Sequence, residues 1–151
     1  MEKKAGGSAR GARRAARLAA VQALYQLEMN EATTQQVIAE FQTLRLAEDA
    51  DRDLFADVVA GTMTRLPELD AEIGRLLAEG WSFERLERVL RAILRAGTYE
   101  LLVRLDVPPR VAINEYVEIA HSFFGGREPN LVNGLLDRLA KERREDELHQ
   151  G

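Results

Sequence analysis

Four arginines near the start of the chain recur at the spacing of a single helix face: Arg10, Arg13, Arg14 and Arg17. On an α-helix, residues three, four and seven positions apart lie on the same side. A guanidinium group is planar and binds phosphate oxygens through two parallel hydrogen bonds. The spacing therefore predicts a cationic stripe that contacts a phosphate backbone and then continues into the core at Val21, Leu24 and Tyr25.

A further arginine lies in the stretch FFGGREPN, which joins two apolar helical patterns and contains Arg127 and Asn130. We expect Gly125 and Gly126 to adopt positive φ and close the preceding helix, and Pro129 to open the next one. Arg127 would then lie beside the free amides of a helix N-terminus, which is a natural anion site.

Few side chains could carry out catalysis. The chain has no cysteine and only two histidines, His121 on the polar edge of a predicted helix and His149 near the end. The acidic run DADRD (49–53) resembles the opening of a calcium loop, but Leu54 stands where that loop requires glycine. We therefore expect no enzymatic activity, no metal site and no cofactor.

Basic charge is concentrated at the start of the chain. Residues 1–17 carry six basic and one acidic side chain, a net charge of +5, whereas the other 134 residues carry −9. A basic arm on an acidic body is typical of proteins that contact nucleic acid. No apolar run approaches the roughly 20 residues of a membrane span, and no secretory signal is evident, so we expect a cytoplasmic protein without membrane contact.

These side chains must be positioned by helices, because Leu, Ala, Glu and Arg dominate and no strand-like alternation occurs. Seven helices are predicted, at about 9–29, 34–42, 50–65, 67–80, 82–105, 109–124 and 129–143, with Ser82 capping the fifth. Short connections favour antiparallel neighbours. We expect an all-α fold of two small packed helical bundles, organised as a flexible basic arm (1–8), an N-terminal subdomain (9–80), a C-terminal subdomain (81–143) and a frayed tail (144–151).

A second arginine stripe lies on the predicted fifth helix, at Arg88, Arg91 and Arg95. An amphipathic helix needs a polar face in any case. The sequence alone leaves open whether this stripe is a solvated face or a partner-binding surface.

Four stretches together resemble the NusB family of bacterial transcription antitermination factors: RRAARLAAVQALYQLE (13–28), VLRAILRAGTYELL (89–102), VPPRVAINEYVEIAHSF (107–123) and NLVNGLLDRLAKE (130–142). The likeness covers nearly the whole chain, and VAINEYVEIA followed by LVNGLLD is its most specific part. It implies an all-helical fold of two bundles. It also implies binding to the boxA RNA of ribosomal RNA operon leaders together with NusE, a small-subunit ribosomal protein, which helps RNA polymerase resist termination.

The resemblance also assigns roles to individual residues. Arg10 joins the implied RNA contacts by its place on the arginine stripe. The RNA-binding residues expected are Arg10, Arg13, Arg14, Arg17, Gln22, Arg127 and Asn130, and those expected toward NusE are Tyr25, Arg88 and Arg91. The family includes monomers and homodimers, so the oligomeric state stays open. Other members can have an acidic residue at the position of Arg127.

Two other interpretations use the same features. One is a helical adaptor whose arginine arm docks an acidic protein partner without RNA. The other is a relative of the helical RNA-binding domain fused to some ribosomal RNA methyltransferases, which the lack of a cofactor loop disfavours. Single-stranded RNA suits the predicted surface, because arginines can follow its backbone. Since aromatic residues are few, stacking should contribute little and the salt dependence should be strong.

Overall fold

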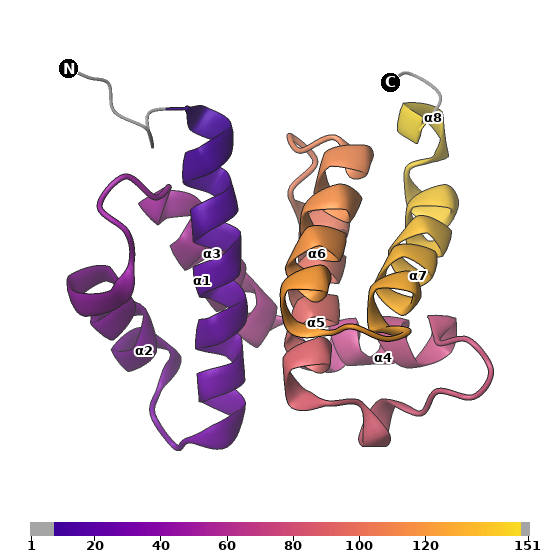
Figure 1. The fold of residues 1–151 in the computed structure, drawn as a ribbon, viewed down its shortest axis with the longest axis horizontal. Coiled ribbons are helices and arrows are strands. Elements are labelled where there is room, and N and C mark those ends of the chain that lie inside the picture. The colour runs from indigo at the N-terminus through magenta and orange to yellow at the C-terminus, as the bar shows by residue number, and fades with distance from the viewer. Residues whose placement is uncertain (1–7, 149–151) are drawn as a thin grey trace. The chain divides into compact units, whose positions relative to one another are not determined.

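The computed structural model describes residues 8–148, and every regular element in that range is a helix (Figure 1). The all-α prediction is confirmed. The chain divides into two compact units between Thr64 and Arg65.

The first unit contains α1 (Ala9–Met29), α2 (Thr34–Glu40) and α3 (Arg52–Thr64), and a π-helical turn (Phe41–Arg45) continues α2. Its main contact is between α1 and α3, and α2 packs against both. Local capping sets where the helices begin. Ser8 accepts a hydrogen bond from the Gly11 amide (2.9 Å), and Thr33 forms a reciprocal capping box at the start of α2.

Small side chains on α1 are fully buried, among them Ala16, Ala20 and Ala23. Phe41 and Phe55 bring larger volume into the core of this unit and stack with their ring centroids 5.6 Å apart. Offset aromatic pairs of this kind add to the stabilisation that burial of apolar area provides. One side of α1 is therefore buried in a well-packed core.

The second unit contains α4 (Leu66–Leu76), a 3-10 turn (Phe83–Arg85), α5 (Arg88–Val103), α6 (Pro109–Phe123), α7 (Glu128–Arg143) and α8 (Glu145–Leu148). The helices α5, α6 and α7 pack against one another, and α4 packs against α5 and α7 (Figure 1). A Cβ atom at Gly97 would lie 2.9 Å from Leu136 Cδ1 and 3.4 Å from Tyr116 Cγ, so this glycine lets α5 approach its two neighbours closely.

The boundary predicted at residue 80 is wrong, because α4 belongs to the second unit. Leu69 and Ile73 on α4 are fully buried, and this helix packs on α5 and α7. An arginine–carboxylate pair reinforces this contact, since Arg95 binds both oxygens of Asp70 at 2.8 Å. Sequence periodicity locates a helix but does not show against which neighbours it packs.

The connection from α4 to α5 also differs from the prediction. The fifth helix begins at Arg88, after a 3-10 turn, and not at residue 82. Ser82 does not cap it: the serine hydroxyl donates to Glu84 Oε1 at 3.3 Å. The linker is therefore a defined irregular segment.

The predicted frayed tail (144–151) is helical over Glu145–Leu148, where Leu148 is buried. Residues 1–7, which make up nearly all of the predicted flexible arm, and 149–151, which include His149, lie outside the described residues.

Candidate nucleic-acid interface

The first two turns of α1 carry three exposed arginines, Arg10, Arg13 and Arg14. A helix N-terminus carries partial positive charge, so cations there oppose the helix dipole by about 0.3–1 kcal/mol each in the first turn. The first turn contains no acidic residue that would offset this. Of the three arginines only Arg10 lies in the first turn, so the dipole opposes Arg10 and has little effect on Arg13 and Arg14.

The predicted stripe of four exposed guanidinium groups is wrong at its last member. Arg17 is only 2% exposed and counts among the buried charged residues. The helical spacing correctly places Arg17 on the same side of α1 as Arg13 and Arg14. It does not show at which residue this side of the helix becomes buried. The exposed part of the stripe ends at Arg14.

A second stripe on α1 is exposed and largely apolar. Leu18, Gln22, Tyr25 and Met29 follow one another at intervals of four, three and four residues, and the three apolar members are 36%, 38% and 44% exposed. The prediction that Tyr25 continues into the core is wrong, because Val21 and Leu24 are buried while Tyr25 faces solvent. Exposed apolar side chains at helical spacing are typical of a protein-binding surface. Sequence reasoning missed Leu18 and Met29, although their spacing from Tyr25 was visible.

Arg127 in the α6–α7 loop and Asn130 in the first turn of α7 lie on the surface of the second unit, and both side chains are exposed. Arg127 is the N-cap residue of α7, but its side chain makes no capping hydrogen bond. Its guanidinium carbon lies 4.6 Å from the centre of the Trp81 ring, in the α4–α5 connection. Arg127 is therefore at the N-terminus of α7, as expected, and its side chain makes a cation–π contact with Trp81. Sequence reasoning missed Trp81, for which the signal was that it is the chain's single tryptophan.

The predicted positive φ at Gly125 and Gly126 is wrong. Among the described residues, Gly80 is the only glycine with positive φ, at +94°. The helix α6 instead ends in an extended residue, Phe124. The two glycines in the loop are not required by a left-handed backbone.

Two arginines of the α5 stripe have contacts within their own unit. Arg91 donates to the Phe83 carbonyl oxygen at 3.1 Å, and its guanidinium lies 5.4 Å from the Phe83 ring centre. Arg95 is paired with Asp70 and its side chain is 12% exposed. Arg88 is exposed. Of the partner-binding residues predicted on α5, Arg91 thus helps to hold the 3-10 turn, and the partner contact of Arg88 stays a prediction.

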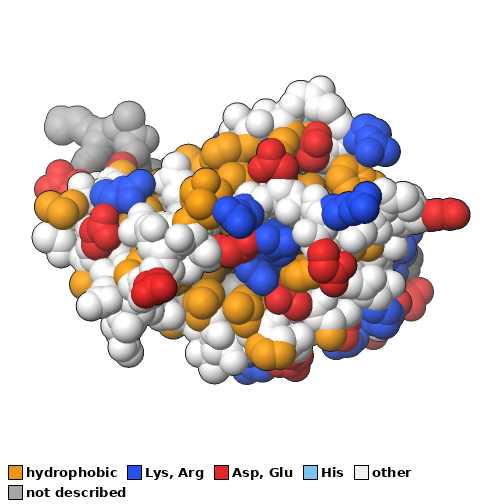
Figure 2. Space-filling model, turned by 90° about the horizontal axis from the view of Figure 1, so that it is seen from below, with side chains coloured by type: hydrophobic (Ala, Val, Ile, Leu, Met, Phe, Trp, Pro, Cys, Tyr) orange, Lys and Arg blue, Asp and Glu red, His pale blue; other side chains and the backbone are white. Residues whose placement is uncertain are grey.

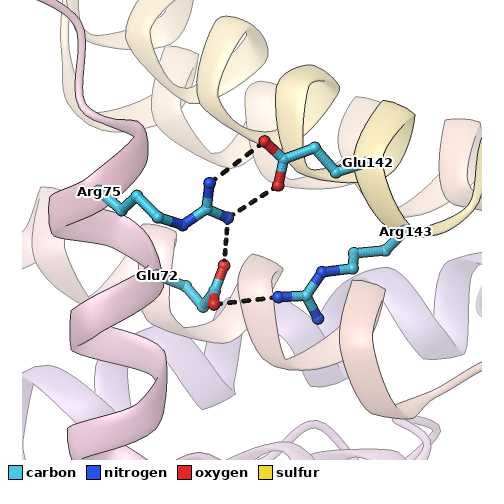
Figure 3. A network of polar contacts seen from close by, with 4 residues as sticks. All are labelled: Glu72, Arg75, Glu142 and Arg143. Carbon is cyan, nitrogen blue, oxygen red and sulfur yellow. Dashed lines mark hydrogen bonds and ion pairs between the residues drawn. The ribbon is translucent and has the colours of Figure 1, made fainter.

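Other charged side chains neutralise one another on the surface of the second unit. Arg75 on α4 pairs with Glu142 on α7 and with Glu72, and Glu72 also pairs with Arg143, in a network of four residues (Figure 3). The hydrogen bond from Arg75 lowers the pKa of the Glu142 carboxyl, and the same bond raises the pKa of Arg75. Figure 2 likewise shows basic and acidic side chains intermingled on one face.

Within residues 8–148, no group of three or more His, Asp or Glu side chains could hold a metal ion. His121 is exposed on α6. None of the helices in this range is long and apolar enough to cross a bilayer.

The fold and surface define an all-α protein of two small helical units whose first helix presents arginines to solvent. The family model described as the NusB family matches residues 14–141. Three curated relatives, each called transcription antitermination protein NusB, come from Sphingopyxis alaskensis (51% identity; 86% of this chain and 93% of the relative), Maricaulis maris (47%; 90% and 90%) and Caulobacter vibrioides (48%; 88% and 95%). A solved structure of T. maritima NusB superposes with a TM-score of 0.78 at 36% identity, covering 91% of this chain and 96% of that one. The chain belongs to the NusB family, and the resemblance found in the sequence is confirmed.

Proposed function

We propose that this transcription antitermination factor of the NusB family binds boxA-type single-stranded RNA jointly with NusE, as part of the RNA polymerase antitermination complex. The observation that supports this most directly is the exposed arginine group at the start of α1: Arg10, Arg13 and Arg14. Arg10, in the first turn of α1, opposes the helix dipole, and a phosphate backbone would relieve that cost. The role involves no catalytic step and no cofactor, and a nascent bacterial transcript would place it in the cytoplasm.

The RNA-binding residues in this proposal are Arg10, Arg13, Arg14 and Gln22 on α1 in the first unit, and Arg127 and Asn130 at the start of α7 in the second unit. All these side chains are exposed in their own units. Arg17 is buried, so in this proposal it does not touch RNA. With three or four arginines on phosphates, the logarithm of the binding constant should fall with the logarithm of salt concentration at a slope of about −2 to −3.

The NusE-binding residues in this proposal are the exposed apolar stripe on α1 in the first unit, with Tyr25 near its centre, and Arg88 on α5 in the second unit, which the family likeness assigns to the same partner. Large aromatic side chains in partly exposed positions are the residues that most often dominate protein interfaces. Tyr25→Ala should therefore weaken NusE binding by about tenfold or more, while Met29→Gln, at the end of the stripe, should have a smaller effect.

The test is an RNA titration at two salt concentrations, with and without NusE. A boxA-containing RNA should bind modestly to the chain alone and more tightly to the heterodimer. By linkage, RNA must strengthen the NusE contact by the same factor. Equal RNA affinity with and without NusE would contradict joint binding, and a salt-independent affinity would contradict the arginine contacts.

A further inference from the structure

The cation–π pair of Trp81 and Arg127 joins two loops that are distant in sequence. Trp81 belongs to the α4–α5 connection and Arg127 to the α6–α7 loop, both within the second unit. Trp81 is only partly buried, so an edge or face of the indole is available to solvent. The indole is the largest aromatic surface that a protein side chain can offer to a flat partner.

Two surface hollows meet at this pair. One has a volume of about 540 Å³ and is lined by Gly80, Trp81, Ser82, Arg85 and Arg127. The other has a volume of about 280 Å³ and is lined by Ala78, Trp81, Arg127, Asn130, Leu131, Gly134 and Arg138. Ligand sites typically occupy about 300–1,000 Å³, so the two together have the size of a site for a small organic group.

The lining has a definite chemistry. Trp81 and Arg127 are common to both hollows, Arg85 borders one, and Arg138 borders the other. Among the described residues that line them, none is acidic, although the protein as a whole has a net charge of −4. An aromatic face between cations, with the amide of Asn130 nearby, fits a nucleobase with its flanking phosphates.

The walls of the hollows are fixed by contacts on both sides of the linker. Arg138 donates to the Leu76 carbonyl oxygen at 2.8 Å, and Arg91 donates to that of Phe83 at 3.1 Å. Between them, the Trp81 amide donates to the Ala78 carbonyl oxygen at 3.2 Å, and Gly80 supplies the positive φ that this turn needs. The backbone that carries the indole is therefore ordered before any ligand binds, which lowers the entropic cost of binding.

We propose that Trp81 is a stacking platform for one unstacked base of the bound single-stranded RNA, and that Arg127 covers this platform in the free protein. This inference rests on the proposed RNA-binding function and adds a base-recognition site to it. A cation–π contact at an exposed site is weaker than base–aromatic stacking. The base therefore displaces the guanidinium from the indole face, and Arg127 then pairs with a phosphate of the same strand.

Because Trp81 is the only tryptophan of the chain, its fluorescence reports directly on the platform. The probe is a 12-nucleotide single-stranded RNA that contains boxA, together with a set of the same RNA in which each position in turn is abasic. We expect the RNA to quench Trp81 fluorescence. We also expect one abasic position to weaken binding about tenfold, the size of one lost base–aromatic stack.

Variants separate stacking from charge. Trp81→Leu should weaken RNA binding about tenfold at every salt concentration and leave the salt slope unchanged, whereas Trp81→Phe should retain most of the affinity. Arg127→Ala should flatten the slope by about 0.7, the contribution of one phosphate contact. In the Trp81→Leu variant, removing the base at that position should no longer weaken RNA binding. Circular dichroism melts confirm that each variant is folded, and the abasic series on the unaltered chain needs no variant at all.

Three outcomes overturn the inference. If RNA binds with a normal salt slope but leaves the fluorescence unchanged and tolerates every abasic position, the base platform is absent while the proposed function stands. If RNA fails to bind at either salt concentration, with or without NusE, both ideas fall. If NusE alone changes Trp81 fluorescence and RNA does not, the hollows belong to a protein contact.

Discussion

Replacing Arg144 with alanine should be among the most destabilising single changes in the second unit. The side chain of Arg144 is 3% exposed and connects the end of α7 to the α5–α6 connection. It donates to the carbonyl oxygens of Val107 (2.8 Å), Leu105 (3.3 Å) and Leu101 (3.4 Å). It also binds both carboxylate oxygens of Glu147, at 2.8 and 2.6 Å.

The magnitude follows from what the substitution leaves behind. A hydrogen bond to a charged group contributes about 1.5–3 kcal/mol, and a buried carbonyl left unpaired costs about 1–3 kcal/mol. Water can still reach Glu147, whose side chain is 41% exposed, so its loss of a partner adds little. We therefore expect Arg144→Ala to lower the free energy of unfolding by about 3–4 kcal/mol.

The assay is urea unfolding followed by Trp81 fluorescence, since Trp81 lies in the same unit as Arg144. With a slope of about 2 kcal/mol per molar urea, the midpoint should fall by about 1.5–2 M. Arg143→Ala is the matched control, because Arg143 is adjacent but 46% exposed, and its pair with Glu72 should contribute less than about 1 kcal/mol. Midpoints of the two variants within about 0.5 M of each other would refute the reasoning, given that slope.

Three further predictions concern charge, pH and backbone. Reversing Arg13 and Arg14 to glutamate should flatten the salt slope of RNA binding by at least about 1.4, and parallel salt lines for variant and parent would count against the α1 contacts. The hydrogen bond from its arginine partner lowers the pKa of Glu147 from 4.5, so this contact stabilises the fold above pH 4.5 and is lost as pH falls below it. In thermal melts at pH values above and below 4.5, the stability of Glu147→Gln should therefore change less with pH than that of the parent chain. Gly80→Ala should cost about 1–2 kcal/mol because φ is positive there, and Gly126→Ala should stay within about 0.5 kcal/mol, as thermal denaturation can check.

Much of the helical order could be predicted from local signals in the sequence. The first helix was predicted at its observed ends, and Pro109 and Pro129 both lie in the first turn of a helix, as expected. Such signals work because capping and proline geometry depend on neighbours in the chain. The extra helix α8 was missed because its Leu148 is held by tertiary contacts, including two hydrogen bonds from Arg110 to the Leu148 carbonyl oxygen.

The candidate site was predicted only in part, for a different physical reason. The types of residue and their spacing pointed to Arg10, Arg13 and Arg14, which are exposed on one helix. They could not show that Arg17 is buried, because burial depends on the packing of other helices. Nor could they show that Arg127 lies against Trp81, 46 positions earlier in the chain, since that contact exists only when α4, α5 and α7 have packed.

The contacts of Arg144 also have a consequence for the order in which the protein is made. The carbonyl groups that it binds lie between Leu101 and Val107, so they leave the ribosome long before their partner does. From Val107 to Leu148, translation at about 5–20 residues per second takes on the order of 2–8 s. The contacts among α1, α2 and α3 all lie within the first 64 residues and can form during that interval or earlier. Folding during synthesis is therefore expected to be sequential, with the second unit completed only when Arg144 and α8 have left the ribosome.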